Sequence, residues 1–557
     1  MKKYIVALGL LFAGGLPLGA QKSANKQAYA KALDIMGASM AMLDRYFVDT
    51  VDMQRLSRQG IDAMLQSLDP YTEYYSKEDN DKLKLLTTGE YGGIGAIISQ
   101  RPDSTVLINE PMEGMPATQA GLRAGDIILE IDGKDYRKST SEVVSAALKG
   151  APGTKISILI QRMGEAKPRR IDFVRRKIVV SPVSYYGTTP AGNGYIALTS
   201  FTNSAASEVR KAYLELRERH KIKGLVLDLR ENGGGLLDEA VKILSMFVPE
   251  GTVVVSTKGR ADAKLNESYR TKTKPIDTEM PLVVLIDGRS ASSSEIVAGA
   301  LQDLDRAVVI GQKSYGKGLV QSTLQLPHDG TLKLTTAKYY IPSGRCIQRL
   351  DYHEAREGRG VQETPDSLRA LFHTSKGRPV RDAGGILPDV EAKRDSLPTM
   401  IYYLGYNNDV FDWVTSYTQR HTSIASPKSF RISDADYKDF AQMLESRKFD
   451  YDRQSLKMLD KLRELAEFEG HLKRSAALMD SLKVALEPNL HKDLEALRPS
   501  VEQYLNTAII SRYYYRRGVI EREIISDKVV QTADEYLGDR QRYNQVLSPA
   551  MPASTSK

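Results

Sequence analysis

Two residues of the chain could act together as a nucleophile and its base. Ser292 follows an apolar run, 281–286, that we expect to be a buried strand, and it precedes a helix expected over 293–305. Lys317 lies in a turn between two glycines. A serine needs a base to become a nucleophile, and a lysine can serve where burial lowers its pKa so that the amine is neutral. The pattern therefore predicts covalent catalysis by a Ser–Lys pair.

Each of the two residues also has a simpler interpretation. Ser292 and Glu295 match the capping box Ser-x-x-Glu, so the serine could serve only to cap a helix. Lys317 could be an ordinary surface lysine. Two features favour catalysis. Active sites of α/β folds lie at the carboxyl ends of parallel strands, and the free N–H of Ser293 and the helix dipole both favour a developing negative charge.

The segment around Lys317 also resembles two other motifs. It nearly matches the phosphate loop Gly-x4-Gly-Lys-Ser/Thr, but Gly318 stands where the Mg²⁺-binding hydroxyl should be. Residues 319–326 then alternate like a strand, whereas a phosphate loop leads into a helix. Ser314 and Lys317 match the Ser-x-x-Lys of penicillin-recognising enzymes, but the accompanying Ser-Asp-Asn and Lys-Thr-Gly motifs are missing from the sequence. We therefore prefer the Ser–Lys pair to both.

A glycine-rich loop over 230–236 follows the apolar run 224–229. The simplest role of its glycines is to turn the chain from a strand into a helix. A functional role is also open, because glycine lets the backbone approach a substrate closely. The loop could then offer a second backbone N–H to an oxyanion beside the serine.

The elements that must position these residues follow from the spacing of apolar residues. Apolar strands alternate with helices in the central part of the chain, and runs such as 224–229 are typical of strands buried on both faces. This alternation predicts an α/β core with parallel strands. We expect five regions: a signal peptide over 1–20, an N-terminal helical region over 21–86, a small mixed domain over 87–177, the α/β core over 178–395 and a helical extension over 396–557.

Helical regions flank the two central domains. Apolar residues at helical spacing predict helices over 26–49 and 53–68. In the C-terminal extension the same spacing predicts a stripe that we interpret as core or interface. The stripe consists of Leu459, Leu462, Leu465, Ala466, Leu472, Leu482 and Leu486.

Composition excludes several classes of function. The 557 residues include 78 basic and 70 acidic ones, and the net charge of +8 is too dilute to predict nucleic-acid binding. The single cysteine, Cys346, excludes internal disulfides and thiolate metal clusters. The seven histidines have no metal-ligand spacing, so we expect no metal and no other cofactor.

The N-terminus has the pattern of a secretory signal peptide. Lys2 and Lys3 precede an apolar run over 5–18, and small residues end at Ala20, where we expect the cut. The run is shorter than the roughly 20 apolar residues that a membrane anchor needs. We therefore predict an exported protein without a stable membrane anchor.

The ordered set of motifs resembles the carboxyl-terminal processing proteases from about residue 43 to 390. The resemblance implies a crotonase-like core with an inserted PDZ domain, an N-terminal helical element and a C-terminal helical extension. Departures are small: Gly233 stands where proline is usual, and Ser314-Tyr315 replaces the common Thr-Phe. Besides the serine and lysine segments, the motifs are Leu68-Asp69-Pro70-Tyr71-Thr72, Tyr91-Gly92-Gly93-Ile94-Gly95, Gly121-Leu122-Arg123-Ala124-Gly125-Asp126, Ala337-Lys338-Tyr339-Tyr340-Ile341-Pro342-Ser343-Gly344-Arg345 and Gly385-Ile386-Leu387-Pro388-Asp389.

The resemblance also implies a role for each site residue. Ser292 would be the nucleophile and Lys317 the general base, with Gln321 orienting the amine. Gly234 and the N–H of Ser293 would form the oxyanion hole, and Gly235 fits nearly as well as Gly234. A substrate's terminal carboxylate would bind the backbone of a loop made of Gly92, Gly93, Ile94 and Gly95.

These observations predict an exported serine endopeptidase that recognises protein C-termini and needs no cofactor. Export leaves the periplasm and the cell surface open, and of these two we expect the periplasm. The partners of the peptidase would be proteins with accessible C-termini, together with a second copy of the chain or an activating adaptor. The alternative is a non-catalytic PDZ adaptor or chaperone that binds extracytoplasmic tails. The presence of every reacting side chain favours the peptidase.

Overall fold

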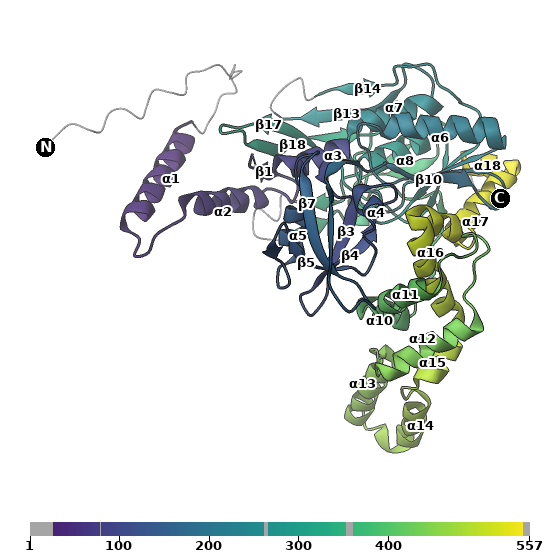
Figure 1. Cartoon of the computed structure of the whole chain (residues 1–557). Helices are drawn as coiled ribbons and strands as arrows, with labels where there is room; N and C mark the ends of the chain where they lie inside the picture. The colour runs from purple at the N-terminus through teal and green to yellow at the C-terminus, as the bar shows by residue number, and fades with distance from the viewer. Residues whose placement is uncertain (1–25, 78, 261–265, 353–359, 550–557) are drawn as a thin grey trace.

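The computed structural model describes residues 26–77, 79–260, 266–352 and 360–549 (Figure 1). The predicted signal peptide over 1–20 lies outside this range. In the described part of the chain, no helix is both long and apolar enough to cross a membrane.

A six-stranded sheet forms the centre of the molecule. Its strand order is β10-β11-β12-β15-β16-β23, and every neighbouring pair is parallel except β10 with β11. The predicted α/β core with parallel strands is therefore confirmed. The strands are β10 (Val183–Thr188), β11 (Gly194–Leu198), β12 (Leu225–Asp228), β15 (Leu282–Ile286), β16 (Val308–Gly311) and β23 (Val390–Glu391).

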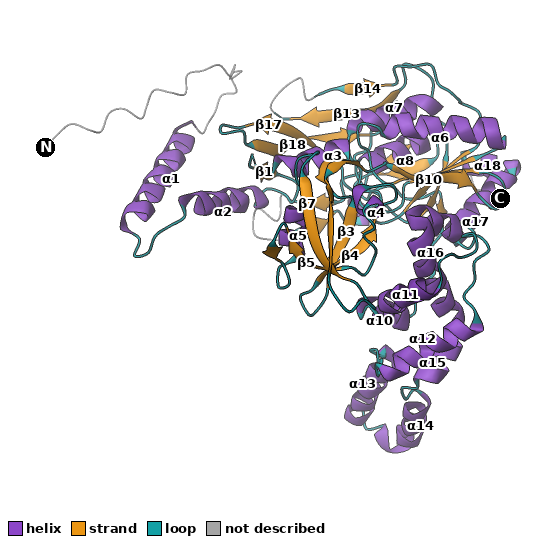
Figure 2. Ribbon diagram, viewed as in Figure 1, coloured by secondary structure: helices purple, strands orange, loops and turns teal. Residues whose placement is uncertain are grey.

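Both faces of this sheet are covered, as the continuous apolar runs predict. Leu227 and Val284 face one apolar core, which includes α6 (Ala205–His220), α7 (Leu237–Phe247) and α8 (Ser293–Asp303). Val226 and Val283, which directly precede these two residues in their strands, face the opposite side, because successive strand residues point to opposite faces. That side is covered by the C-terminal end of the chain (Figure 2): the end of α16 (Arg498–Glu523), α17 (Lys528–Gly538) and α18 (Arg540–Val546).

A second sheet lies beside the core, in the order β1-β18-β13-β14, with β17 paired to β18. Its strand β1 belongs to the N-terminal region, and Glu73 pairs with Lys333 of β18. This pairing brings the residues just before β1 to the core. The strands are β1 (Glu73–Tyr75), β13 (Val253–Gly259), β14 (Ser268–Arg270), β17 (Leu319–Gln325) and β18 (Thr331–Tyr340). Short strands β19 (Leu350–Asp351), β20 (Gln362–Glu363), β21 (Leu371–His373) and β22 (Pro379–Arg381) form two further pairs.

The small domain enters and leaves the core through an antiparallel pair, β2 (Glu90–Gly93) with β9 (Arg176–Val179). Its own apolar centre contains the fully buried Ile108, Val144 and Ile158. The domain comprises β3 (Ala96–Gln100), β4 (Val106–Pro111), α4 (Pro116–Gln119), β5 (Ile127–Ile131), β6 (Lys134–Asp135), α5 (Ser141–Leu148), β7 (Lys155–Gln161) and β8 (Arg169–Val174).

The N-terminal helices α1 (Lys26–Tyr46) and α2 (Met53–Gln66) extend away from the rest of the molecule (Figure 1), and α3 (Asn80–Thr88) leads into the small domain. Helix α1 has no buried residue, so its predicted apolar stripe is exposed. The expected helices are confirmed, but α1 adds nothing to the core of this chain.

The C-terminal extension is helical, as predicted, and has its own core around Trp413, Phe440 and Leu505. The predicted leucine stripe divides between α13 and α14: Leu459 is buried, whereas Leu462 and Leu482 are exposed. The remaining helices are α10 (Thr399–Tyr406), α11 (Asp409–Arg420), α12 (Asp434–Ser446), α13 (Gln454–Phe468), α14 (Leu472–Ala485) and α15 (Leu490–Ala496).

The cover formed by α17 should be essential for stability. We expect Val530→Asp to lower the free energy of unfolding by about 3 kcal/mol or more, because it buries an unpaired carboxylate against the sheet. Val530 is 0% exposed. Gln531→Asp is the matched control, since Gln531 is exposed on the same helix. Urea unfolding measures both variants, and equal midpoints would show that α17 does not close the core.

Candidate active site

Ser292 stands at the tight turn between β15 and α8. Its backbone has φ 54° and ψ −115°, a conformation that residues other than glycine rarely adopt. Such strain costs on the order of 1–3 kcal/mol and persists where the surroundings enforce it, often at functional sites. The N–H of the next residue, Ser293, donates no hydrogen bond to any described residue. This N–H group is therefore free to donate a hydrogen bond to a negatively charged oxygen at the start of the helix.

Glu295 connects the serine turn to the lysine turn. Its carboxylate is fully buried, and its Oε2 atom accepts the N–H of Ser292 at 2.8 Å and the N–H of Lys317 at 2.9 Å. Its Oε1 atom accepts the Ser314 hydroxyl at 2.5 Å and the Gly316 N–H at 2.7 Å. Burial raises the pKa of Glu295 to about 7, and these four donors counteract part of that rise.

A buried tyrosine joins the same two residues from the other side. The Tyr339 hydroxyl lies 3.2 Å from the carbonyl oxygen of Ser292 and 2.6 Å from that of Lys317. The N–H groups of the serine and lysine thus meet at one carboxylate, and their carbonyl groups meet at one phenol. The structure therefore brings the predicted nucleophile and base together through their backbones.

The environment of the Lys317 amine makes it a plausible base. The side chain is half-buried, and its Nζ atom lies 4.2 Å from the centre of the Tyr71 ring. Burial, followed by the positive charge of Lys333, lowers the pKa of Lys317 to about 8. About half of the amine is then neutral near pH 8 and about a tenth at pH 7, so the neutral form that a general base requires is accessible at mildly alkaline pH.

Gln321 lies on β17, close in sequence to the lysine, but it bonds elsewhere. Its Nε2 atom donates to the Thr335 hydroxyl at 3.1 Å on the neighbouring strand. Within the described residues no hydrogen bond joins it to Lys317. An orienting role would require Gln321 to exchange this partner.

The glycine loop lies against the serine turn. A Cβ atom on Gly234 would lie 2.8 Å from the Cβ of Ser292 and 3.0 Å from the Ser293 nitrogen, so only glycine fits. The N–H of Gly234 donates to the side-chain oxygen of Asn232 at 2.9 Å. An oxyanion would compete with that oxygen for this donor, whereas no described group accepts the N–H of Gly235.

Buried side chains hold the glycine loop on both sides. Asn232 donates from Nδ2 to the Leu198 carbonyl at 2.7 Å, and its own carbonyl accepts the Ala291 N–H at 3.0 Å. Arg230 forms ion pairs with Asp228 of β12 and, at 2.7 Å, with Asp527 between α16 and α17. The loop is thus tied to the serine turn and to the C-terminal helices.

The loop predicted to bind a carboxylate lies in the small domain, apart from the serine and lysine. Gly92 and Gly93 belong to β2 and pair with β9, whereas Ile94 and Gly95 lie beyond the strand. Gly95 has φ +70°, and a Cβ atom there would lie 2.4 Å from the Cβ of Met115. No described group accepts the N–H groups of Ile94 and Gly95, so they remain available to a carboxylate.

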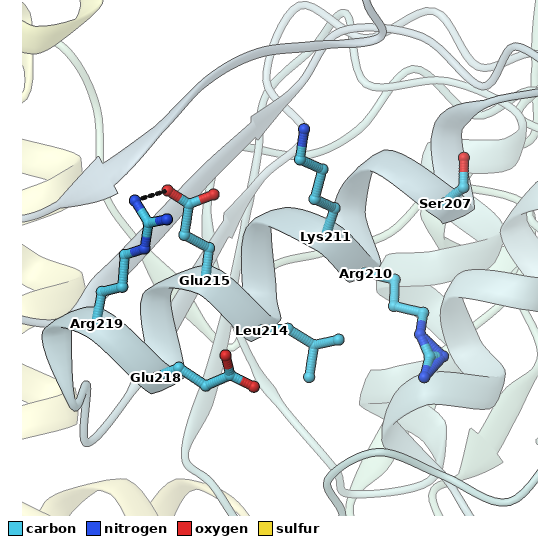
Figure 3. A pocket seen from close by; sticks show the side chains of 7 residues that line it. All are labelled: Ser207, Arg210, Lys211, Leu214, Glu215, Glu218 and Arg219. Atoms are coloured by element: carbon cyan, nitrogen blue, oxygen red, sulfur yellow. Dashed lines mark ion pairs between the residues drawn. The ribbon is translucent and has the colours of Figure 1, made fainter.

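A hollow along α6 lacks this chemistry. Figure 3 shows a pocket along α6 in which Arg219 pairs with Glu215 at 3.1 Å, and it contains none of the predicted site residues. Within the described ranges, no group of three His, Cys, Asp or Glu side chains could hold a metal ion.

The sequence pattern assigns no functional role to three residues of the site. Glu295 matches only a capping box, and that motif is the one signal the sequence offers for it. Tyr339 lies in a motif typical of the family but had no role assigned. Asn232 lies in the glycine loop, and nothing in its local pattern distinguishes it from a turn residue.

Family profiles match three parts of the chain. Peptidase family S41 matches residues 192–354, a PDZ domain matches 107–162, and the C-terminal helical domain of probable PDZ-proteases matches 400–537. The first two lie within the regions expected for the α/β core and the small domain.

Individual relatives agree with these profiles. The carboxy-terminal-processing protease of Bartonella bacilliformis is 39% identical over 347 residues, which are 61% of this chain and 76% of the relative. The carboxyl-terminal-processing protease of Synechocystis sp. is 38% identical over 296 residues, 52% of this chain and 68% of the relative. A solved photosystem II D1 C-terminal processing protease is 26% identical, covers 65% of this chain and 94% of its own, and superposes with a TM-score of 0.36.

The Glu295 carboxylate should be required for the geometry of both turns. We expect Glu295→Gln to lower the free energy of unfolding by about 2–4 kcal/mol, because an amide nitrogen in place of one oxygen leaves two buried donors unpaired. Glu218→Gln on the exposed side of α6 is the control. Denaturant unfolding tests both, and a change of less than about 0.5 kcal/mol in Glu295→Gln would contradict the assignment.

Proposed function

This chain belongs to peptidase family S41, the carboxyl-terminal processing proteases, which are serine peptidases, and we propose that it cleaves proteins by a Ser–Lys mechanism. The observation that carries the proposal is that Glu295 Oε2 accepts the N–H groups of both Ser292 and Lys317. The serine turn and the lysine turn, which α8 separates in the chain, are thereby hydrogen-bonded to the same carboxylate oxygen. The serine of one turn can supply a nucleophile, and the lysine of the other can supply a neutral amine.

In the proposed reaction the neutral Lys317 amine removes the hydroxyl proton as Ser292 Oγ attacks the scissile carbonyl carbon. The negative charge of the tetrahedral intermediate develops on the former carbonyl oxygen, which the Ser293 N–H and the glycine loop would stabilise. Collapse breaks the C–N bond, and the ammonium returns its proton to the leaving amine. Water, deprotonated by the same lysine, then hydrolyses the acyl-enzyme and restores Ser292.

The oxyanion hole and the orientation of the lysine are part of the proposal. Gly234 and Ser293 are the predicted donors, and Gly235 remains as an alternative to Gly234 because its N–H has no described acceptor. Gln321 would orient the amine after exchanging its bond to Thr335. We propose no cofactor for either the oxyanion hole or the orientation of the lysine.

Recognition of C-termini would fall to the PDZ domain. The backbone N–H groups of the loop over 92–95 would bind the terminal carboxylate, and the tail would add a strand beside β3. We further propose export to the periplasm, on the pattern of residues 1–20, and action on proteins with accessible C-termini. Self-association or an activating adaptor also stays a prediction, as do the domain limits at 87–177 and 178–395.

The mechanism is tested by cleavage of an unstructured protein with a free apolar C-terminus. We expect Ser292→Ala and Lys317→Ala each to lower kcat by at least about 10³-fold, because each removes a group that takes part in bond making. Ser207→Ala and Lys211→Ala, on α6 away from the site, are the matched controls. Full activity in Ser292→Ala would refute the assignment of Ser292 as the nucleophile. Tail binding without cleavage by any form would favour the adaptor.

Tail recognition is tested by a pair of glycine variants in the PDZ domain. We expect Gly95→Ala to raise KM for a tailed substrate by about tenfold, because the added methyl displaces the loop against Met115, at a cost of about 1–2 kcal/mol. Gly133→Ala also adds a methyl at positive φ but meets no atom within 4 Å. Amidation of the substrate tail should abolish the difference between the variants. Equal KM values with a free tail would argue against this loop.

A further inference from the structure

The turn formed by Asp69, Pro70, Tyr71 and Thr72 lies next to the lysine although it precedes the small domain in the chain. Strand β1, which follows the turn directly, pairs with β18 through Tyr74 and Leu332. β18 also pairs with β17, the strand that begins just after Lys317. The N-terminal region therefore contributes a wall of the candidate site.

This turn is closed by its own hydrogen bonds and is joined to β18 of the core. The buried Asp69 accepts the N–H groups of Tyr71 and Thr72, both at 2.8 Å, through one carboxylate oxygen. The Thr72 hydroxyl oxygen accepts the Thr335 N–H at 3.3 Å. Thr335 is also the residue that binds Gln321, so the turn and the lysine strand share a partner.

Tyr71 faces the base. The Lys317 Nζ atom lies 4.2 Å from the centre of the Tyr71 ring, well within the range of a cation–π contact. The ring is fixed at its far end, because the Tyr71 hydroxyl lies 3.4 Å from the hydroxyl of Tyr315 and 3.3 Å from that of Tyr352. Tyr352 also packs edge-on against the Tyr71 ring, at 6.0 Å between centroids.

We propose that Tyr71 is a positioning residue for Lys317. The face of the Tyr71 ring stabilises the ammonium group that forms when Lys317 accepts the proton of the serine hydroxyl. This inference rests on the proposed function. In a half-buried site the new positive charge has little water around it, so the electron-rich ring face replaces part of the lost hydration. The N-terminal region would then complete the active site of a core from which it is separated by the whole PDZ domain.

Other charges near the lysine act in opposing directions. Lys333 of β18 disfavours the ammonium, whereas Asp69, Glu73 and Glu295 favour it. Replacement of Tyr71 by an uncharged side chain leaves all four in place. A change in the titration of the base in such a variant therefore does not come from the loss of one of these charges; it comes from the ring and from the burial that the ring gives the amine.

The test compares kcat, KM and the pH profile of kcat/KM in Tyr71→Phe and Tyr71→Leu. We expect Tyr71→Phe to remain within about threefold of the wild type and Tyr71→Leu to lose about tenfold in kcat with KM unchanged, because only the latter loses the ring. The acid limb, expected near pH 8 in the wild type, should move to lower pH in Tyr71→Leu, since the ammonium loses a stabilising contact.

Two controls separate a local effect from damage to the fold. Tyr74→Leu removes a ring in the same segment that stacks on Arg58, away from the lysine, and should leave kcat unchanged. Tyr71→pentafluorophenylalanine keeps the shape of the phenylalanine ring but reverses its quadrupole, so it should resemble Tyr71→Leu even if the leucine variant is unstable. Wild-type kcat and pH profile in both Tyr71→Leu and the fluorinated variant would overturn the inference.

Failure of the inference can be distinguished from failure of the proposed function. If Lys317→Ala is inactive while the Tyr71 variants behave as wild type, only the role of Tyr71 is refuted. If Lys317→Ala retains activity, the Ser–Lys mechanism itself is refuted, and with it the role of Tyr71.

Discussion

One buried carboxylate determines the geometry on which the rest of the site depends. Glu295 accepts the backbone N–H groups of Ser292 and Lys317, and the Tyr339 hydroxyl reaches their carbonyl oxygens. Burying a carboxylate is costly, and several donors are needed to offset the loss of hydration. Because all four donors come from the two turns, any shift of one turn against the other would leave part of that charge unpaired. The same bonds hold Ser292 in its strained backbone conformation.

That buried carboxylate is carried by a sheet that is closed on both faces. α8, which carries Glu295, packs into the core on one face, and the last helices of the chain cover the other. The ion pair between Arg230 and Asp527 extends this cover to the glycine loop. The C-terminal extension is therefore part of the structure that supports the site, although it contributes none of the proposed reacting groups.

Segments that are far apart in the chain meet at the site because strand pairing brings them there. The β1–β18 pair places the turn with Tyr71 beside the lysine, and the β2–β9 pair inserts the PDZ domain between that turn and the core. One consequence is that the chain leaves the neighbourhood of the site, forms an entire domain and returns.

The sequence alone determined the α/β core, because the strands of the core are apolar runs and its helices have clear apolar faces. The sequence also identified Ser292, Lys317 and the glycine loop as candidate site residues, through their residue types and the elements beside them. Hydrogen-bond partners distant in the chain could not be inferred in this way. Glu295 matched a helix cap equally well, Gln321 bonds to Thr335 on another strand, and Tyr71 precedes the lysine by a whole domain. Only tertiary packing decides which face of the sheet the C-terminal helices cover and which side chains surround the lysine amine. The physical reason is that local periodicity specifies which face of an element is apolar but not what packs against it.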